Sequence, residues 1–163
     1  MLTDEQLAQL AGELESHNVE RTTSTTDTEK FCIAICAFAN DFPDHRKPGY
    51  LLIGVDESGR SAGIEVTERL LERVGGLRSD GNILPLPAMT VERRSLHGAD
   101  IVLIEVLPSD LPPVRYRGRV WIRVGPRRAV ATEQEERILS ERRARSIRSF
   151  DARACEGCGL AEL

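Results

Sequence analysis

Three carboxylates are the residues of this chain whose types and positions are best suited to catalysis. Glu15 and Glu20 lie near the N-terminus, and Asp56 follows the apolar run 49–55, where a buried strand would leave the core and meet solvent. Three carboxylates that meet at one point repel one another unless they hold a divalent cation, and oxygen ligands suit magnesium or manganese. The chain therefore contains a candidate metal site, although spacing alone does not bring the three residues together.

A basic segment between residues 113 and 128 is the second candidate site. Its arginines alternate with Tyr116 and Gly118 at the period of a strand, which predicts that Arg115, Arg117 and Arg119 point to one side. Such a row could follow successive phosphates, and an aromatic ring could stack on a base. The predicted nucleic-acid contacts are Arg115, Tyr116, Arg117, Arg119, Trp121, Arg123, Arg127 and Arg128. The alternative is a solvated strand whose arginines pair with neighbouring glutamates.

Charge is distributed unevenly along the 163 residues. The formal net charge is −4, but residues 1–60 carry eleven acidic and five basic residues, which is a net charge of −6. Residues 113–150 carry eleven arginines against four glutamates, which is a net charge of +7. This asymmetry favours a polyanionic partner for the second half of the chain, despite the acidic total.

Cysteines and short motifs give weaker signals. Cys32 and Cys36 lie in an apolar segment of helical period and are expected to be small core residues. Cys155 and Cys158 have the spacing of half a zinc site, but the sequence contains no second Cys or His pair after them. The chain lacks the phosphate loop, the dinucleotide fingerprint and the nucleophile elbow, so nucleotide hydrolysis and serine-hydrolase chemistry are not expected.

The apolar pattern predicts an α+β fold, with a mixed, mainly antiparallel sheet and helices packed against it in two layers. The predicted helices run from a capping box at Thr3 to about Leu14, from a cap at Thr26 to about Asn40, over 67–74, and onward from a capping box at Thr132. Strands are predicted within 15–22, over 49–55 with a returning strand to 64, over 89–93 and 99–106 as a hairpin, and over 120–124. In the last helix, Ile138 and Ile147 are predicted to face the body and the arginines to face solvent.

The length fits one domain, which we predict to comprise residues 1–148, with 149–163 as a tail that starts a linker to a further region. Hydrophobic residues make up 40% and charged residues 29% of the chain, and no apolar run is long enough to span a membrane. The N-terminus has no basic region followed by an apolar one, as a signal peptide would. We therefore expect a cytoplasmic protein with no membrane partner.

Three short sequence segments, here called phrases, together resemble a known family. The phrases "AFAN", "GYLLIGVDESG" and "RVWIRVG" follow one another within residues 15–140. In this order they resemble the Alba-like DNA-binding domain of the Schlafen group, also called the divergent AAA domain of bacterial transcriptional regulators. The resemblance implies a nucleic-acid-binding module at the N-terminus of a bacterial regulator.

The same resemblance implies a competing enzymatic function. Ribonuclease-active Schlafen proteins carry an acidic trio that matches Glu15, Glu20 and Asp56, but they usually have Phe-Lys where this chain has Arg21-Thr22. The primary expectation is binding of DNA or RNA. The alternatives are a magnesium- or manganese-dependent endoribonuclease and a protein-interaction or oligomerisation domain, and the sequence leaves open whether the chain forms a homodimer.

Overall fold

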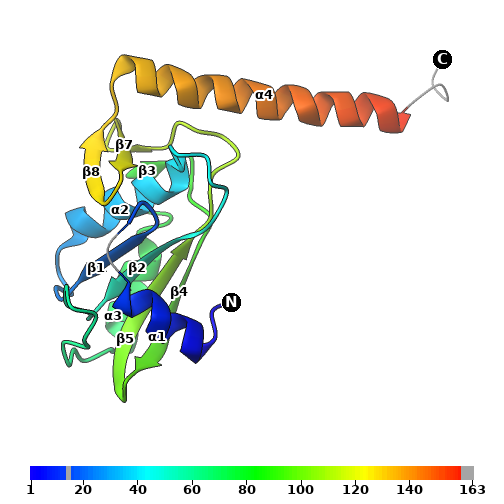
Figure 1. The fold of residues 1–163 in the computed structure, drawn as a ribbon. Helices are drawn as coiled ribbons and strands as arrows, with labels where there is room; N and C mark the ends of the chain where they lie inside the picture. The colour runs from blue at the N-terminus through cyan, green and yellow to red at the C-terminus, as the bar shows by residue number, and fades with distance from the viewer. Residues whose placement is uncertain (14–15, 159–163) are drawn as a thin grey trace.

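Helix α2 (Thr28–Asn40) is the most buried element of the computed structural model, which describes residues 1–13 and 16–158. Ten consecutive residues, Phe31–Asn40, are buried, because this helix is apolar on every side and is therefore covered on every side. Two sheets provide the cover, and α2 lies between them (Figure 1).

The first sheet is the predicted mixed, mainly antiparallel one, with the strand order β1-β2-β5-β4. Its strands are β1 (Val19–Thr22), β2 (Gly49–Ile53), β5 (Ala99–Val106) and β4 (Met89–Leu96). β1 and β2 are parallel, since α2 forms the crossover between them, and the other two pairs are antiparallel. Leu51 and Ile53 of β2 pack with α2, whereas Leu52 packs with Leu7 on the opposite face of the sheet.

The second sheet is entirely antiparallel and has the order β3-β6-β7-β8. Its strands are β3 (Ile83–Leu84), β6 (Arg115–Tyr116), β7 (Arg119–Val124) and β8 (Arg127–Val130). Asn40, the last residue of α2, holds this sheet in place. Its Nδ2 donates to the carbonyl oxygens of Val114 (2.9 Å) and Trp121 (2.7 Å), and its Oδ1 accepts from the Val114 amide (2.6 Å).

Three further helices complete the α+β fold of the described residues: α1 (Asp4–Gly12), α3 (Glu68–Gly76) and α4 (Glu133–Cys158). The capping boxes predicted at Thr3 and Thr132 are both present. α4 begins beside the second sheet and then runs away from the body (Figure 1). Among the described residues, no helix is both long enough and apolar enough to cross a membrane.

Two local predictions around the first sheet are wrong. The cap of α2 is Asp27, whose Oδ1 accepts from the Lys30 amide at 3.2 Å, and not Thr26. The strand expected to return after β2 does not form, because the chain turns at Gly54 (φ +100°) and then makes only an isolated bridge between Val55 and Ser61.

The predicted orientation of α4 is wrong for its isoleucines and for Arg142, whereas Arg137, Arg143 and Arg145 are exposed as predicted. Ile138 and Ile147 are 38% and 44% exposed, whereas Leu139 is fully buried against the second sheet. Arg142, predicted to face solvent, donates to the backbone carbonyls of Asp41 (2.7 Å) and Phe42 (2.9 Å) just after the end of α2. One buried leucine and one arginine therefore set the rotation of α4.

Candidate nucleic-acid interface and the acidic residues

Two β-hairpins of the second sheet carry the arginines of the predicted interface. The turn between β6 and β7 consists of Arg117 and Gly118, both with positive φ (+48° and +82°), as in the tight turns that join twisted strands. The prediction of one row of arginines is therefore wrong. Because the chain reverses direction at Arg117, Arg115 pairs with Val120 and Arg119 with Tyr116, so Arg115 and Arg119 lie on opposite faces of the sheet.

Four of these arginines are both exposed and without an ion pair to a carboxylate in the described part of the chain. They are Arg117, Arg119, Arg127 and Arg128, and we call them the hairpin arginines. Arg115 differs from them, because its Nη1 lies 2.9 Å from Glu136 Oε1 in the first turn of α4. A guanidinium without an internal carboxylate keeps its fork of N–H donors available for phosphate.

The two aromatic residues of the predicted interface pack into the core. Tyr116 is 5% exposed, and burial raises the pKa of its hydroxyl. Arg117 lies outside it, with Cζ 5.4 Å from the centroid of the Tyr116 ring. Trp121 is partly buried against the same core, next to α2. In this structure both rings therefore contribute to the packing of the second sheet on α2.

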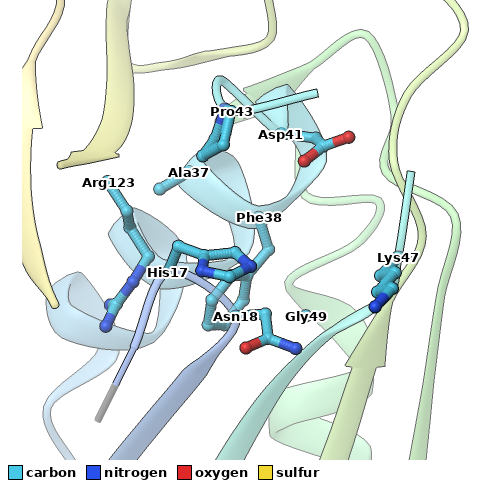
Figure 2. A pocket seen from close by; sticks show the side chains of 9 residues that line it. All are labelled: His17, Asn18, Ala37, Phe38, Asp41, Pro43, Lys47, Gly49 and Arg123. Atoms are coloured by element: carbon cyan, nitrogen blue, oxygen red, sulfur yellow. The ribbon is translucent and has the colours of Figure 1, made fainter. Parts of the chain in front are cut away.

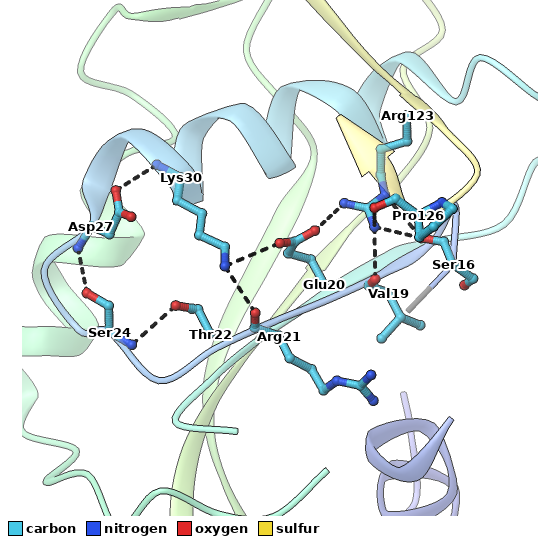
Figure 3. A network of polar contacts seen from close by, with 10 residues as sticks. All are labelled: Ser16, Val19, Glu20, Arg21, Thr22, Ser24, Asp27, Lys30, Arg123 and Pro126. Atoms are coloured by element: carbon cyan, nitrogen blue, oxygen red, sulfur yellow. Dashed lines mark hydrogen bonds and ion pairs between the residues drawn. The ribbon is translucent and has the colours of Figure 1, made fainter. Parts of the chain in front are cut away.

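Arg123, the remaining predicted phosphate contact, is buried and joins the second sheet to β1 (Figure 3). Its guanidinium donates to three backbone carbonyls, those of Ser16, Val19 and Pro126. It also forms an ion pair with Glu20 Oε2, while Glu20 Oε1 lies 3.4 Å from Lys30 Nζ of α2. Both carboxylate oxygens of Glu20 therefore face cations that belong to the chain itself.

Asp56, another member of the predicted acidic trio, lies in an exposed turn beyond β2. Its Oδ1 accepts hydrogen bonds from the Ser58 hydroxyl (2.6 Å), the Ser58 amide (2.9 Å) and the Arg60 amide (2.9 Å). These donors, the Ser58 hydroxyl first among them, lower the pKa of Asp56 because they stabilise the ionised form. The carboxylate thus closes its own turn.

Glu20 and Asp56 belong to opposite sides of the first sheet. Glu20 pairs in register with Leu51 and faces α2, whereas the turn that holds Asp56 packs at Gly59 against Ala11, near the end of α1. Glu15 lies outside the described residues. Within those residues, no group of three His, Cys, Asp or Glu side chains is placed to hold a metal ion. The metal role of the trio stays a prediction.

Cys32 and Cys36 are buried free thiols, as predicted. Burial raises the pKa of Cys32 to about 11 and that of Cys36 to about 12, which leaves both thiols protonated and unreactive near neutral pH. The side chains of Cys155 and Cys158 lie outside those that the structure describes.

A small pocket beside α2 was not predicted (Figure 2). His17, Lys47 and Arg123 line it together with Asp41, and the ring of His17 stacks on that of His45 with centroids 4.3 Å apart. Burial is the main cause that lowers the pKa of His17, and the charge of His45 adds to it. The two histidines come from separate loops with no common spacing, so the sequence carries no signal for the pair.

The sequence model of the family described as Schlafen, AlbA_2 matches residues 15–132, which confirms the resemblance noted from the three phrases. The N-terminal domain of a RecG-related protein from Nitrosomonas europaea is similar in fold, with 19% identity, coverage of 66% of this chain and 74% of that one, and a TM-score of 0.53. A Corynebacterium diphtheriae protein shares 19% identity over 72% of this chain but only 25% of its own, with a TM-score of 0.49. No curated protein matches the chain.

Proposed function

Because the chain belongs to the Schlafen, AlbA_2 family, we propose that it is a nucleic-acid-binding domain whose hairpin arginines contact phosphates. The observation that carries the proposal is the exposure of Arg117, Arg119, Arg127 and Arg128 on two adjoining hairpins, without a carboxylate partner in the described part of the chain. The Nitrosomonas europaea domain comes from a protein named for its relation to a DNA helicase, which is in keeping with this class of partner. The finer role we propose is that of a recognition module in a bacterial transcriptional regulator.

The spacing of the hairpin arginines suits a long polyanion. Arg119 begins β7, and Arg128 pairs with Arg123 near its other end, so both lie on the same face of the sheet, roughly 13 Å apart at about 3.3 Å per residue. Duplex DNA carries about one charge per 1.7 Å of its axis, so the two ends of β7 would reach separate groups of phosphates. The internal pairing of Glu20 with Arg123 and Lys30 also neutralises a carboxylate close to β7.

The salt dependence of binding tests the proposal. Each arginine that contacts a phosphate and is replaced by glutamine should reduce the slope of log K against log salt by about one unit, so Arg119→Gln/Arg128→Gln should reduce it by about two. The measurement is fluorescence anisotropy with a 20-base-pair DNA duplex and with a structured RNA. The matched control is Arg60→Gln/Arg69→Gln, which removes two exposed arginines outside the hairpins. Absence of binding by the wild type, or equal slopes for the two variants, would overturn the proposal.

The competing endoribonuclease is tested with the same nucleic acids. Wild type, Glu20→Gln and Asp56→Asn are incubated with the RNA in magnesium, in manganese and in chelator. We expect salt-sensitive binding without cleavage in all three solutions. Metal-dependent cleavage that Asp56→Asn abolishes would establish the enzyme instead, since a carboxylate that only closes a turn has no catalytic step to support.

A further inference from the structure

Helix α4 carries a second basic surface, separate from the hairpins. The helix is anchored to the body by Leu139, by Arg142 and by the ion pair between Glu136 and Arg115. Beyond this anchor the helix projects into solvent (Figure 1). Its 26 residues lie outside the part of the chain that matches the family, so the family does not account for it.

The charge of this part of the helix is strongly one-sided. Residues 137–148 contain five arginines and a single glutamate, Glu141. Arg142 is used at the anchor, while Arg137, Arg143 and Arg145 are exposed and form no ion pair within the described part of the chain. At about 100° per residue, Arg137 and Arg145 point roughly 160° and 120° away from the buried Leu139 and therefore face away from the body. Arg143 points about 40° from Leu139, but it follows Arg142, the last residue of the anchor, and is exposed.

A helix of this kind lacks the usual sources of stability. Beyond Arg142 the described side chains include a single large apolar one, Ile147, which is 44% exposed, whereas most helical stability in proteins comes from the packing of an apolar face. Arginines within one or two turns of each other also repel. A second copy of the helix would add further arginines and increase that repulsion. A polyanion would remove it, so charge complementarity selects a phosphate backbone as the partner.

We propose that the exposed arginines of α4 form a second phosphate-binding element, which extends the contact of the hairpins along duplex nucleic acid. The inference rests on the proposed function, because it needs a nucleic-acid partner. Arg137 and Arg145 lie roughly 12 Å apart along the helix, at 1.5 Å per residue. That length corresponds to about three to four base pairs of duplex, at two charges per base pair and 1.7 Å per charge.

The test compares three variants on duplexes of two lengths. The helix variant is Arg137→Gln/Arg143→Gln/Arg145→Gln, and glutamine is chosen because it is a good helix former that removes the charge. Arg119→Gln/Arg128→Gln reports on the hairpins, and Arg60→Gln/Arg69→Gln is the control for charge. Each is measured by anisotropy on 10- and 20-base-pair duplexes of DNA and of RNA, over a range of salt concentrations. Circular dichroism checks that the helix variant keeps its helix.

We expect the helix variant to reduce the salt slope on the 20-base-pair duplex by about three units. It should also lose most of the affinity that wild type gains between 10 and 20 base pairs, because the outer contacts are then missing. Glu141→Gln should bind more tightly than wild type, since it removes the one acid of the segment. The DNA and RNA arms show which duplex the helix favours.

The outcomes separate the two proposals. If wild type binds, the hairpin variant weakens binding and the helix variant does not, the inference about α4 fails while the proposed function stands. If the wild type binds neither duplex, the proposed function fails and the inference about α4 fails with it. If the helix variant alone weakens binding, α4 is a phosphate-binding element and the assignment of the hairpin arginines is overturned.

Discussion

At the scale of single residues, Glu20 and Arg123 are charges whose partners lie inside the protein. Arg123 is 2% exposed, and its guanidinium ties β7 to β1 and the residues just before it through Glu20 and the carbonyls of Ser16 and Val19. Desolvation of two ions consumes much of their mutual attraction, but removal of one partner leaves the other charge buried and uncompensated. The ion pair itself adds little net stability, but the loss of either residue should destabilise the contact between the sheets, because the other charge stays buried without a counter-ion.

We expect Glu20→Gln to lower the free energy of unfolding by about 3 kcal/mol, because Arg123 then stays buried without its counter-ion. Arg123→Met should lower the free energy of unfolding by a comparable amount. The double variant Glu20→Gln/Arg123→Met should lower it by much less than the sum of the two single effects. Urea denaturation of the three variants gives the coupling energy. A Glu20→Gln variant as stable as wild type would show that the carboxylate is not structural and would return Glu20 to the candidate metal ligands.

The stacked His17 and His45 should make stability depend on pH. The folded-state pKa of His17 is lowered by burial and then by the charges of His45, Arg123 and Lys47, while Asp41 opposes the shift. The unfolded chain therefore binds more protons in the pH window between the folded-state pKa and the ordinary histidine pKa of 6.5. The stability due to neutral His17 is complete above pH 6.5 and is lost as the pH falls toward the folded pKa.

Thermal unfolding between pH 7.5 and pH 5.5 checks this expectation. The melting temperature of wild type should fall more over this range than that of His17→Gln, which has no imidazole to protonate. His97→Gln serves as the control, since His97 lies in an exposed turn. If the melting temperatures of wild type and His17→Gln fell equally between pH 7.5 and pH 5.5, protonation of His17 would not be the cause of the pH dependence.

The sequence identified the arginine-bearing segment but not the role of each arginine in it. Arg119 and Arg123 occupy equivalent positions in an alternating strand, yet one is exposed and the other is buried. The difference arises from Glu20, which lies about a hundred residues earlier in the chain and meets Arg123 only through the fold. The local sequence pattern predicts on which face of the strand an arginine lies. Whether that arginine is exposed or forms an internal ion pair depends on residues that are distant in the sequence.

At the scale of elements, the contact between α2 and β2 leaves no room for a side chain at Gly49. A Cβ at this position would overlap the ring of Phe38, which is itself 3% exposed and held by the surrounding core. In α3, by contrast, a Cβ at Gly75 would meet nothing within 4 Å, and the backbone there does not have positive φ. Packing thus requires a glycine at position 49, whereas nothing in the surroundings of position 75 requires one.

Alanine at the two positions should therefore shift stability in opposite directions. Gly49→Ala should cost about 1–3 kcal/mol through overpacking against Phe38. Gly75→Ala should stabilise α3 by about 0.5–1 kcal/mol, because it reduces the conformational freedom of the unfolded chain. Urea denaturation of both variants measures the two shifts, and a stabilising Gly49→Ala would mean that α2 and β2 are less tightly packed than described.

Elements with a strong local signal were predicted well, and those defined by a distant partner were not. α1, α2, α3 and the β4–β5 hairpin follow apolar periods and caps that lie within the element itself. β3 and β6 are two residues long; β3 is defined by its pairing with β6, and β6 by its pairing with β3 and β7. The turn at Arg117 was missed because a non-glycine residue with positive φ is uncommon.

At the scale of the whole molecule, the structure does not end where the family match ends. Residues 15–132 contain both sheets and α2, but Leu139 of α4 closes a third core cluster with Val120 and Ile122. Arg142 adds hydrogen bonds to the loop after α2, and Arg115 adds an ion pair to Glu136. These contacts all lie before residue 147, so the first part of α4 belongs to the folded unit.

Two shortened chains test this boundary. A chain that ends at Ser146 keeps Leu139 and Arg142, and its melting temperature should stay close to that of the full chain. A chain that ends at Thr132 leaves Val120 and Ile122 without the buried leucine, and loss of such a side chain costs about 2–5 kcal/mol. Leu139→Ala in the full chain should reproduce most of the same loss. If the chain that ends at Thr132 were as stable as the one that ends at Ser146, the packing of α4 would contribute nothing to the fold, and the arginines of α4 would then have no rigid support from which to reach phosphate.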